Sequence, residues 1–233
     1  MDGRRSPATL PFAPPPPEFE DLLEGENYQA VSAVRRMLGG DAGASSVYVW
    51  GRRGCGKTHL LRTAAANMRR EKRAAFYAGG GEEIPPPMPG LLAADDIGDM
   101  AGEARLFFFD WQNKLKPDDP RYAILAAGGA PPVQTGIGEE IAARLSAGLV
   151  FQLREITEAE KRRALEKYAR RRGFALPESV SGMFLARLPR DMTSLIAALA
   201  DLDNFLLARQ KPLTMPLARK WLQSRPPPFF GGE

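Results

Sequence analysis

A glycine-rich segment at residues 51–58 carries the most recognisable chemistry in this chain. Its sequence, GRRGCGKT, fits the pattern G-x-x-x-x-G-K-[S/T] of a phosphate-binding loop. The glycines let successive backbone N–H groups face a single anion, Lys57 can reach the outer phosphates, and the Thr58 hydroxyl can ligate Mg²⁺. The segment therefore predicts a nucleotide and Mg²⁺ site formed by Gly51, Gly54, Cys55, Gly56, Lys57, Thr58 and His59.

The residues on either side of this loop favour a functional interpretation over a chance glycine-rich turn. Residues 47–50 are apolar and prone to form a strand, and residues 59–68 have the composition of a helix. A loop between a strand and a helix presents the positive end of the helix to bound phosphates. His59 is the only histidine. We expect it to pack or hydrogen-bond locally in the first helical turn, and not to catalyse.

Cys55, inside the loop, admits two interpretations. Its neighbours Arg52, Arg53 and Lys57 would favour a thiolate. The simpler interpretation, which we favour, is a small residue that fills a tight loop.

Two adjacent acids close an apolar stretch at residues 91–96, which reads as a buried strand. Asp95 is predicted to hold Mg²⁺ through water, next to Thr58. Asp96 is predicted to orient or activate the attacking water. Paired acids are common on protein surfaces, but a preceding buried-type strand, downstream of a phosphate-binding loop, favours the catalytic interpretation.

Apolar stretches alternate with helical ones as far as residue 153. Further strands are expected at 74–78, 122–127 and 149–153, and a helix at 104–115. Strands alternating with helices predict an α/β fold with a parallel sheet covered on both faces. The helix carries an aromatic and apolar stripe that we expect to be core: Leu106, Phe107, Phe108, Phe109, Trp111 and Leu115.

Beyond residue 153 the pattern is helical only. Thr157 and Glu160 form a capping box, and Gly173 is the expected end of that helix. Along it, Glu158–Arg162 and Glu166–Arg170 have the spacing of ion pairs. Further helices are expected at 177–188, 191–208 and 215–222. The predicted domains are a flexible N-terminal tail (1–18), a nucleotide-binding α/β domain (19–153), a small all-α lid (154–222) and a disordered C-terminal tail (223–233).

The bulk properties fit a globular protein that works in a reducing compartment. The chain has 233 residues, a formal net charge of +4 and a single cysteine, which excludes an internal disulfide. No apolar run reaches the roughly 18 residues of a membrane span. The N-terminus leads into prolines and not into an apolar signal core, so a cytoplasmic location is expected. The mild positive charge permits contact with nucleic acid without requiring it.

The motifs together resemble the DnaA-related branch of the AAA+ ATPases, and within it the Hda-type inactivators of DnaA. The resemblance covers about residues 19–222. Its specific elements are Phe19, Gly25 and Asn27 ahead of the first strand, the loop-to-helix sequence at 56–61, the acids at 95–97, residues 142–149, residues 188–192 and the lid end at 211–214. The chain stops at the lid, so the helix-turn-helix domain of DnaA is not expected.

The resemblance implies ADP or ATP with Mg²⁺ as the bound cofactors and assigns roles to further residues. Arg144 would be an arginine finger aimed at the γ-phosphate of a partner's nucleotide, since a guanidinium is always charged and binds two oxygens at once. Arg190 would touch the phosphates of this chain's own nucleotide. Where the family often has a polar sensor residue, this chain has Gly129. Without that side chain, intrinsic ATP hydrolysis is expected to be weak.

The resemblance also implies partners. DnaA would be the protein whose ATP hydrolysis is stimulated, with DNA contacted indirectly. A DNA polymerase sliding clamp would bind Leu10 and Phe12 in the N-terminal tail, although the glutamine usual in such a peptide is absent. The alternative for these two residues is plain disordered sequence. A homo-oligomer is left open, and no membrane partner is expected.

Two other functions compete with this one. A self-sufficient AAA+ ATPase, such as a helicase loader of the DnaC type, would need its own hydrolysis and contacts to single-stranded DNA. A DnaA-like DNA-binding module would need the helix-turn-helix that the sequence lacks. For Arg144 itself, the alternative to a finger is an ordinary surface arginine at a helix end.

Overall fold

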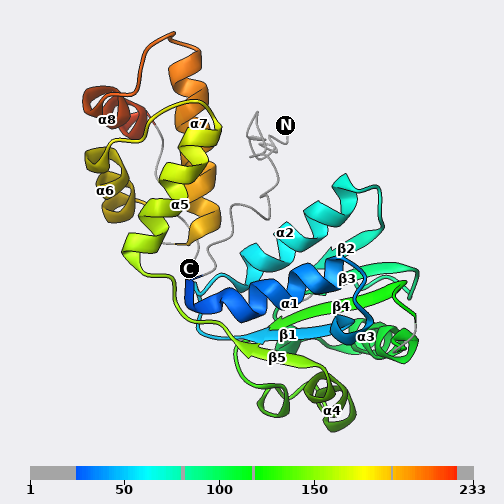
Figure 1. The fold of residues 1–233 in the computed structure, drawn as a ribbon. Helices are drawn as coiled ribbons and strands as arrows, with labels where there is room; N and C mark the ends of the chain where they lie inside the picture. Colours follow the sequence, from blue (N-terminus) through cyan, green and yellow to red (C-terminus); the bar gives the residue numbers. More distant parts are fainter. Residues whose placement is uncertain (1–24, 80–81, 117–118, 190, 225–233) are drawn as a thin grey trace, which may run out of the picture.

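A computed structural model describes residues 25–79, 82–116, 119–189 and 191–224. Five parallel strands form one sheet in the order β2-β3-β4-β1-β5. The strands are β1 (Ser46–Trp50), β2 (Ala75–Ala78), β3 (Gly90–Ala94), β4 (Tyr122–Gly128) and β5 (Leu149–Gln152). Because all run the same way, the loops that follow β1, β3 and β4 lie along one edge, as Figure 1 shows.

Alternating side chains of the strands build two separate cores. On one face Val47, Val49 and Leu91 pack against α1 (Tyr28–Leu38) and α2 (Lys57–Arg70). On the other, Tyr48 and Leu92 pack with α3 (Gly102–Lys114) and α4 (Glu139–Ala147). The period of two residues in a strand sends neighbours to opposite faces. The uninterrupted apolar strands of the sequence therefore serve both faces, as predicted for a parallel sheet.

The expectation for the aromatic stripe on α3 was only partly right. Phe108 and Trp111 are fully buried, but Leu106 is 66% exposed. Four consecutive residues of a helix point in all directions, since each step turns the chain by about 100°. Residues 106–109 cannot all face the sheet, and only the positions that do are core.

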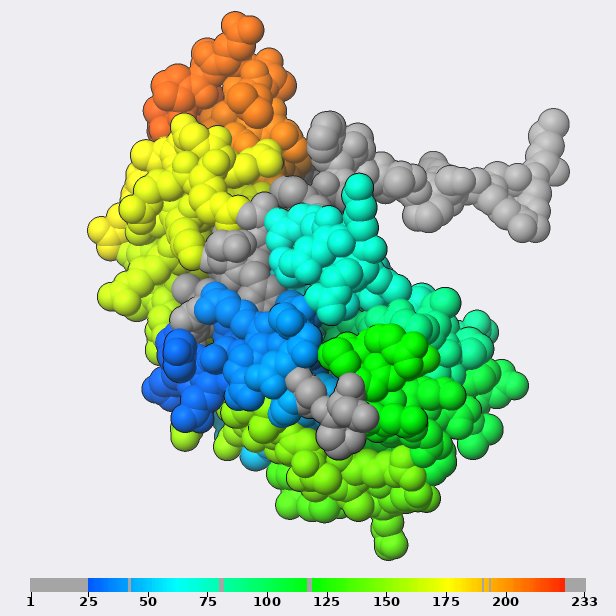
Figure 2. Space-filling view, turned by 45° about the vertical axis from the view of Figure 1, so that its right-hand side comes forward, coloured from blue at the N-terminus to red at the C-terminus, as the bar shows by residue number. Residues whose placement is uncertain are grey.

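The lid is a four-helix unit with its own core. It consists of α5 (Glu158–Arg171), α6 (Glu178–Arg187), α7 (Met192–Leu207) and α8 (Met215–Gln223). Phe184 stacks on Trp221 with ring centroids 5.5 Å apart, and the indole N–H of Trp221 donates to Asp201 at 2.8 Å. In the space-filling view the lid stands as a mass distinct from the sheet domain (Figure 2).

Local signals in the lid sequence are confirmed. Thr157 and Glu160 form the predicted capping box, and Gly173 follows the helix with a φ of +87°, which only glycine adopts easily. Glu166 pairs with Arg170 at 3.9 Å. Arg162 pairs with Glu178 of α6, so this arginine ties two lid helices together. No helix in the described ranges is long and apolar enough to cross a membrane.

Candidate nucleotide site and the Arg144 surface

The loop after β1 has the geometry of a phosphate cradle. Gly56 caps α2 with a φ of +104°, a conformation that strains any residue with a Cβ. At Gly51 a Cβ would lie 2.6 Å from the carbonyl oxygen of Leu153. The chain turns sharply here because these positions carry no side chain. The N-terminus of α2, with its unpaired N–H groups, is thereby aimed into the loop.

Lys57 is held inside this loop. Its side chain is buried, and its ammonium donates to the carbonyl oxygens of Gly51 at 2.8 Å and Arg52 at 3.2 Å. An ammonium has three N–H donors, so one remains for a phosphate oxygen. Thr58, half buried in the first turn of α2, stands beside it. Lys57 and the Thr58 hydroxyl thus lie together at the N-terminus of α2.

The two acids that follow β3 differ in environment. Asp95 is 2% exposed and accepts from the Tyr77 hydroxyl and from the Asp96 N–H, both at 3.1 Å. Asp96 is more exposed and adopts φ +47°. Burial, and then the charge of Asp95, raises the pKa of Asp96, while the charge of Lys57 lowers it. The loop after β1 and the acids after β3 therefore lie close to one another.

The donor set fits Mg²⁺ bound together with a nucleotide. Mg²⁺ in such sites takes one or two protein oxygens and fills the remaining positions with phosphate oxygens and water. The described residues hold no cluster of three or more His, Cys, Asp or Glu side chains that would cage a metal by themselves. Asp95 and the Thr58 hydroxyl are the two oxygen groups of this loop and strand end that would hold a cation carried in by a nucleotide.

Sequence reasoning missed Tyr77 and Tyr48, which both bear on this site. Tyr77 lies on β2, and the Arg62 guanidinium sits 5.0 Å from its ring centre. Tyr48 lies on β1, donates to the carbonyl oxygen of Ala130 at 2.7 Å, and has its pKa raised by burial and by the charge of Asp96. Their aromatic character predicted strands well. Nothing local in the sequence signals which neighbour each hydroxyl meets.

The last residue of β4 and the residue after it are both glycines, and they differ in the space around them. A Cβ on Gly128 would fall 2.2 Å from the Tyr48 hydroxyl, so that position is closed. Around Gly129 no atom lies within 4 Å of an added Cβ. The position that family resemblance assigns to a polar sensor is therefore open space, and a larger side chain would fit there.

Cys55 and His59 are both buried. Burial raises the pKa of the Cys55 thiol despite the opposing charge of Lys57, which favours the loop-filling interpretation over the thiolate. Burial lowers the pKa of His59 to about 4, with Asp191 opposing the shift and Arg62 reinforcing it. Asp191 also caps α7 by accepting from the Ser194 N–H at 2.8 Å. His59 thus lies where the lid meets α2.

A second lid contact lies at the connection from β5 to α5. The Asn27 side chain forms two hydrogen bonds with the backbone of Arg154, at 3.0 Å from its amide nitrogen and 2.7 Å to its amide oxygen. Residue 156 packs near the loop, since a Cβ on Gly56 would lie 3.7 Å from the Ile156 methyl. Asn27 therefore ties the turn ahead of α1 to the β5–α5 connection beside the phosphate cradle.

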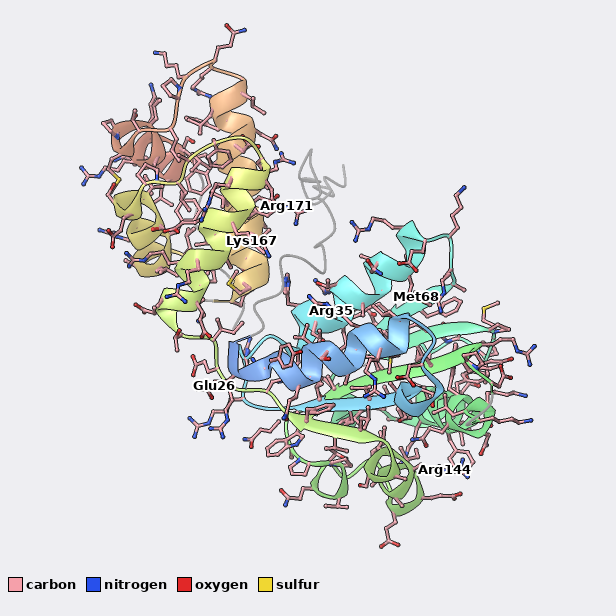
Figure 3. The ribbon with its side chains drawn as sticks, in the orientation of Figure 1. Glu26, Arg35, Met68, Arg144, Lys167 and Arg171 are labelled. Carbon is pink, nitrogen blue, oxygen red and sulfur yellow. The ribbon has the colours of Figure 1, made fainter. Side chains whose placement is uncertain are left out.

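Arg144 lies far from this site, on α4 (Figure 3). Its guanidinium stacks over the Phe109 ring at 4.5 Å and bonds to Asn113 and to Glu140, the latter at 2.9 Å. With Ser45, Ser46 and Gln112 it also lines a cavity of about 400 Å³. Ser46 is the first residue of β1, and the phosphate loop begins just after the last one. At ~3.3 Å per residue, the length of the strand separates Ser46 from the loop by about 16 Å. The structure does not bring Arg144 to this chain's own loop.

Several predicted residues lie outside the described ranges. These are Arg190, Phe19, and the tail residues Leu10 and Phe12.

The fold is the AAA+ architecture, a P-loop sheet with a helical lid. Residues 158–222 match the family model described as "Hda, lid domain". The fold resembles domain III of the replication initiation protein DnaA from Thermotoga maritima, with a TM-score of 0.60 and 16% identity over 88% of this chain and 95% of that one. The lid is therefore similar to that of Hda, the chain has the fold of DnaA domain III, and the predicted fold class is confirmed.

Two further structures show how widely the fold is shared. AMPPCP-bound DnaA from Aquifex aeolicus has a TM-score of 0.57 and 18% identity, covering 77% of this chain and 62% of that one. The RuvB Holliday junction branch migration motor of T. maritima has a TM-score of 0.60 and 14% identity, covering 90% and 72%. This chain thus spans less than two thirds of the Aquifex protein, and identities this low establish the fold alone.

Proposed function

We propose that this protein is a negative regulator of chromosomal replication initiation that stimulates ATP hydrolysis by DnaA in trans. The observation that carries the proposal is the position of Arg144. It stands at the start of β1, while the phosphate loop stands at the other end of that strand. A guanidinium so placed cannot serve its own nucleotide and is suited to another protein's γ-phosphate.

The choice of DnaA as the partner rests on the lid and on the fold. The lid matches the Hda lid model, and the AAA+ domain has the fold of DnaA domain III. Two domains of one fold can pack side by side so that the finger of one completes the site of the next. The sliding clamp enters the proposal through Leu10 and Phe12 of the tail, on sequence grounds only.

We assign the phosphate loop of this chain a holding role for ADP or ATP. Gly51, Gly54, Cys55, Gly56, Lys57 and Thr58 line the phosphates, with His59 behind them, and Arg190 is proposed to reach them from the lid. Asp95 and Thr58 would hold Mg²⁺, which supplies charge neutralisation at the phosphates when bound. Asp96 can orient a water, but the open space at Gly129 offers no second polar group. Slow intrinsic hydrolysis follows.

The decisive experiment follows ADP formation by ATP-loaded DnaA after addition of this protein, DNA and DNA-loaded clamp. We expect stimulation, and we expect Arg144→Ala to reduce it by about 10³-fold, the scale of an arginine finger. Arg121→Ala is the matched control, because Arg121 is a surface arginine that pairs with Asp119 and should leave stimulation unchanged.

Two results would overturn the proposal. If the Arg144→Ala variant stimulates DnaA as well as wild type does, Arg144 is not an arginine finger. Turnover by this protein alone above about 1 s⁻¹, a rate typical of enzymes, would favour a self-sufficient ATPase of the helicase-loader kind. Omitting the clamp from the mixture tests the tail separately. Stimulation without the clamp would exclude a role for clamp binding and would leave the proposed role of Arg144 unchanged.

A further inference from the structure

Three side chains from two helices fix the Arg144 guanidinium on the surface of α3 and α4. The Phe109 ring lies under it at 4.5 Å. Asn113, one turn further along α3, accepts from one terminal nitrogen, and Glu140 on α4 accepts from the other at 2.9 Å. A long side chain with many rotamers is thereby held in one place before any partner arrives.

The contacts leave the guanidinium able to bind a further anion. It has five N–H donors, and the Asn113 and Glu140 contacts use one from each terminal nitrogen. The Arg144 side chain remains 37% exposed. The remaining donors are therefore available to a phosphate, provided that the neighbours do not oppose its charge.

The three side chains that contact Arg144 differ in charge. Phe109 and Asn113 are neutral, and an aromatic face under a guanidinium keeps its plane fixed without reducing its charge. Glu140 carries a negative charge 2.9 Å from the guanidinium nitrogen and is itself 67% exposed. An incoming γ-phosphate would be repelled by that carboxylate and would compete with it for the same nitrogen.

We infer that Phe109 and Asn113 are positioning residues for the Arg144 finger. We also infer that the negative charge of Glu140 weakens the attraction of the finger for a phosphate, a role that we call a charge brake. The inference rests on the proposed function, because it assumes that Arg144 acts on a partner's phosphate. Phe109 and Asn113 hold the guanidinium in its working orientation. Glu140 keeps it partly neutralised until a more strongly charged phosphate displaces the carboxylate.

The simpler alternative is that Glu140–Arg144 is an ordinary helix-surface ion pair. Such i,i+4 pairs add a little helix stability and have no other effect. Under that alternative, removing any of the three neighbours would cost some stability and change stimulation weakly and in one direction. The brake predicts opposite signs for neutral and charged neighbours, which stability loss cannot produce.

The test uses the full-length chain in the DnaA hydrolysis assay with Glu140→Gln, Asn113→Ala and Phe109→Leu. Glutamine keeps the length and an acceptor oxygen but removes the charge. We expect Glu140→Gln to raise the maximal stimulated rate by about threefold, since the competing charge is gone. We expect Asn113→Ala and Phe109→Leu to lower it by about tenfold, because an unpositioned finger loses orientation.

The concentration of protein that gives half-maximal stimulation should stay unchanged in all three variants, because the finger engages only in the transition state. Glu166→Gln is the matched control, since Glu166–Arg170 is an i,i+4 pair on the lid helix α5. It should alter neither quantity. Melting temperatures of all the variants establish that they fold.

The outcomes separate the two levels of inference. If wild type gives no stimulation, or Arg144→Ala loses none, the proposed function fails. If Arg144→Ala abolishes stimulation but Glu140→Gln lowers it or leaves it unchanged, the brake fails and the finger stands. If folded Asn113→Ala and Phe109→Leu keep the wild-type rate, the positioning role fails.

Discussion

The two ends of the sheet hold a cationic side chain in opposite ways. At the nucleotide end Lys57 is buried and bonded to backbone carbonyls of its own loop. At the other end Arg144 is partly exposed and bonded to side chains of α3 and α4. Backbone partners cannot move without unfolding the loop, whereas side-chain partners can change rotamer. Under the proposed function, the Lys57 end would retain a nucleotide, and the Arg144 guanidinium could exchange its side-chain partners for a phosphate of another protein.

The largest effect is expected at the buried lysine. Lys57→Met keeps the length of the side chain but removes the charge that faces the phosphates. The one ammonium donor left for a phosphate makes a charge-assisted hydrogen bond of about 1.5–3 kcal/mol, so ADP affinity should fall by about 10–100-fold. Fluorescence titration with a labelled ADP measures it.

The same variant separates nucleotide binding at the Lys57 end from stimulation of DnaA by the Arg144 end. If the nucleotide only sets the shape of the chain, Lys57→Met should regain stimulation of DnaA at saturating ADP. The control is Arg52→Met, at an exposed position in the same loop, which should bind ADP nearly as well as wild type. ADP binding of wild-type strength by Lys57→Met would contradict the phosphate role.

Acid should weaken the nucleotide end through His59. Its folded pKa of about 4 lies below the unfolded value of 6.5, so the unfolded chain takes up the proton first. The stability that this shift contributes is complete above pH 6.5 and is lost as the pH falls to about 4, a change of about 3 kcal/mol. Urea unfolding at a series of pH values measures it.

His59 is the only histidine, so it provides its own control. His59→Gln should flatten the slope of unfolding free energy between pH 6.5 and 5, where carboxylates titrate little. An unchanged slope in that variant would show that His59 is solvated and not buried against the lid.

A smaller effect is expected from the hydroxyl that holds Asp95. Tyr77→Phe removes the 3.1 Å hydrogen bond and keeps the ring under Arg62. Residues that orient a metal ligand typically change metal affinity by 10–100-fold, and we expect about tenfold here because the Asp96 N–H still holds the carboxylate. Titrating Mg²⁺ against ADP binding measures this. A change in ADP affinity without Mg²⁺ would instead indicate a packing defect.

The smallest effect is expected from restoring a polar group at the end of β4. Gly129→Asn places an amide in open space beside the site and should raise intrinsic ATP turnover by a few-fold. Gly129→Ala adds a Cβ without a polar group and is the matched control. Equal rates for Asn and Ala would mean that glycine at this position does not limit hydrolysis.

Local sequence signals predicted much of this molecule. The loop at 51–58 is recognisable because its glycines and its lysine are needed within eight consecutive residues. The capping box at Thr157 and the glycine after α5 are equally local, and both were predicted at the right residues. The predicted ends of the strands agree with the observed ends to within one or two residues, because polar residues bound the apolar, β-prone runs.

The predictions that failed depend on which neighbour a side chain meets. The less favoured alternative for Cys55 was a thiolate beside Arg52 and Arg53, but burial raises the pKa of that thiol instead. Leu106 belongs to an apolar run, yet it points to solvent because the helix turns it away from the sheet. Proximity along the chain is a poor guide to electrostatics and burial, since both are set by packing from elsewhere.

The sequence alone determined the phosphate loop, the acids that follow a buried strand, and the change from an α/β domain to a helical lid. These features follow from residue type and spacing within one element. The tertiary structure decided that Tyr77 holds Asp95, that the lid residue Asp191 faces His59, and that Phe109, Asn113 and Glu140 surround Arg144. Each of these joins separate elements, and only packing determines which side chains meet.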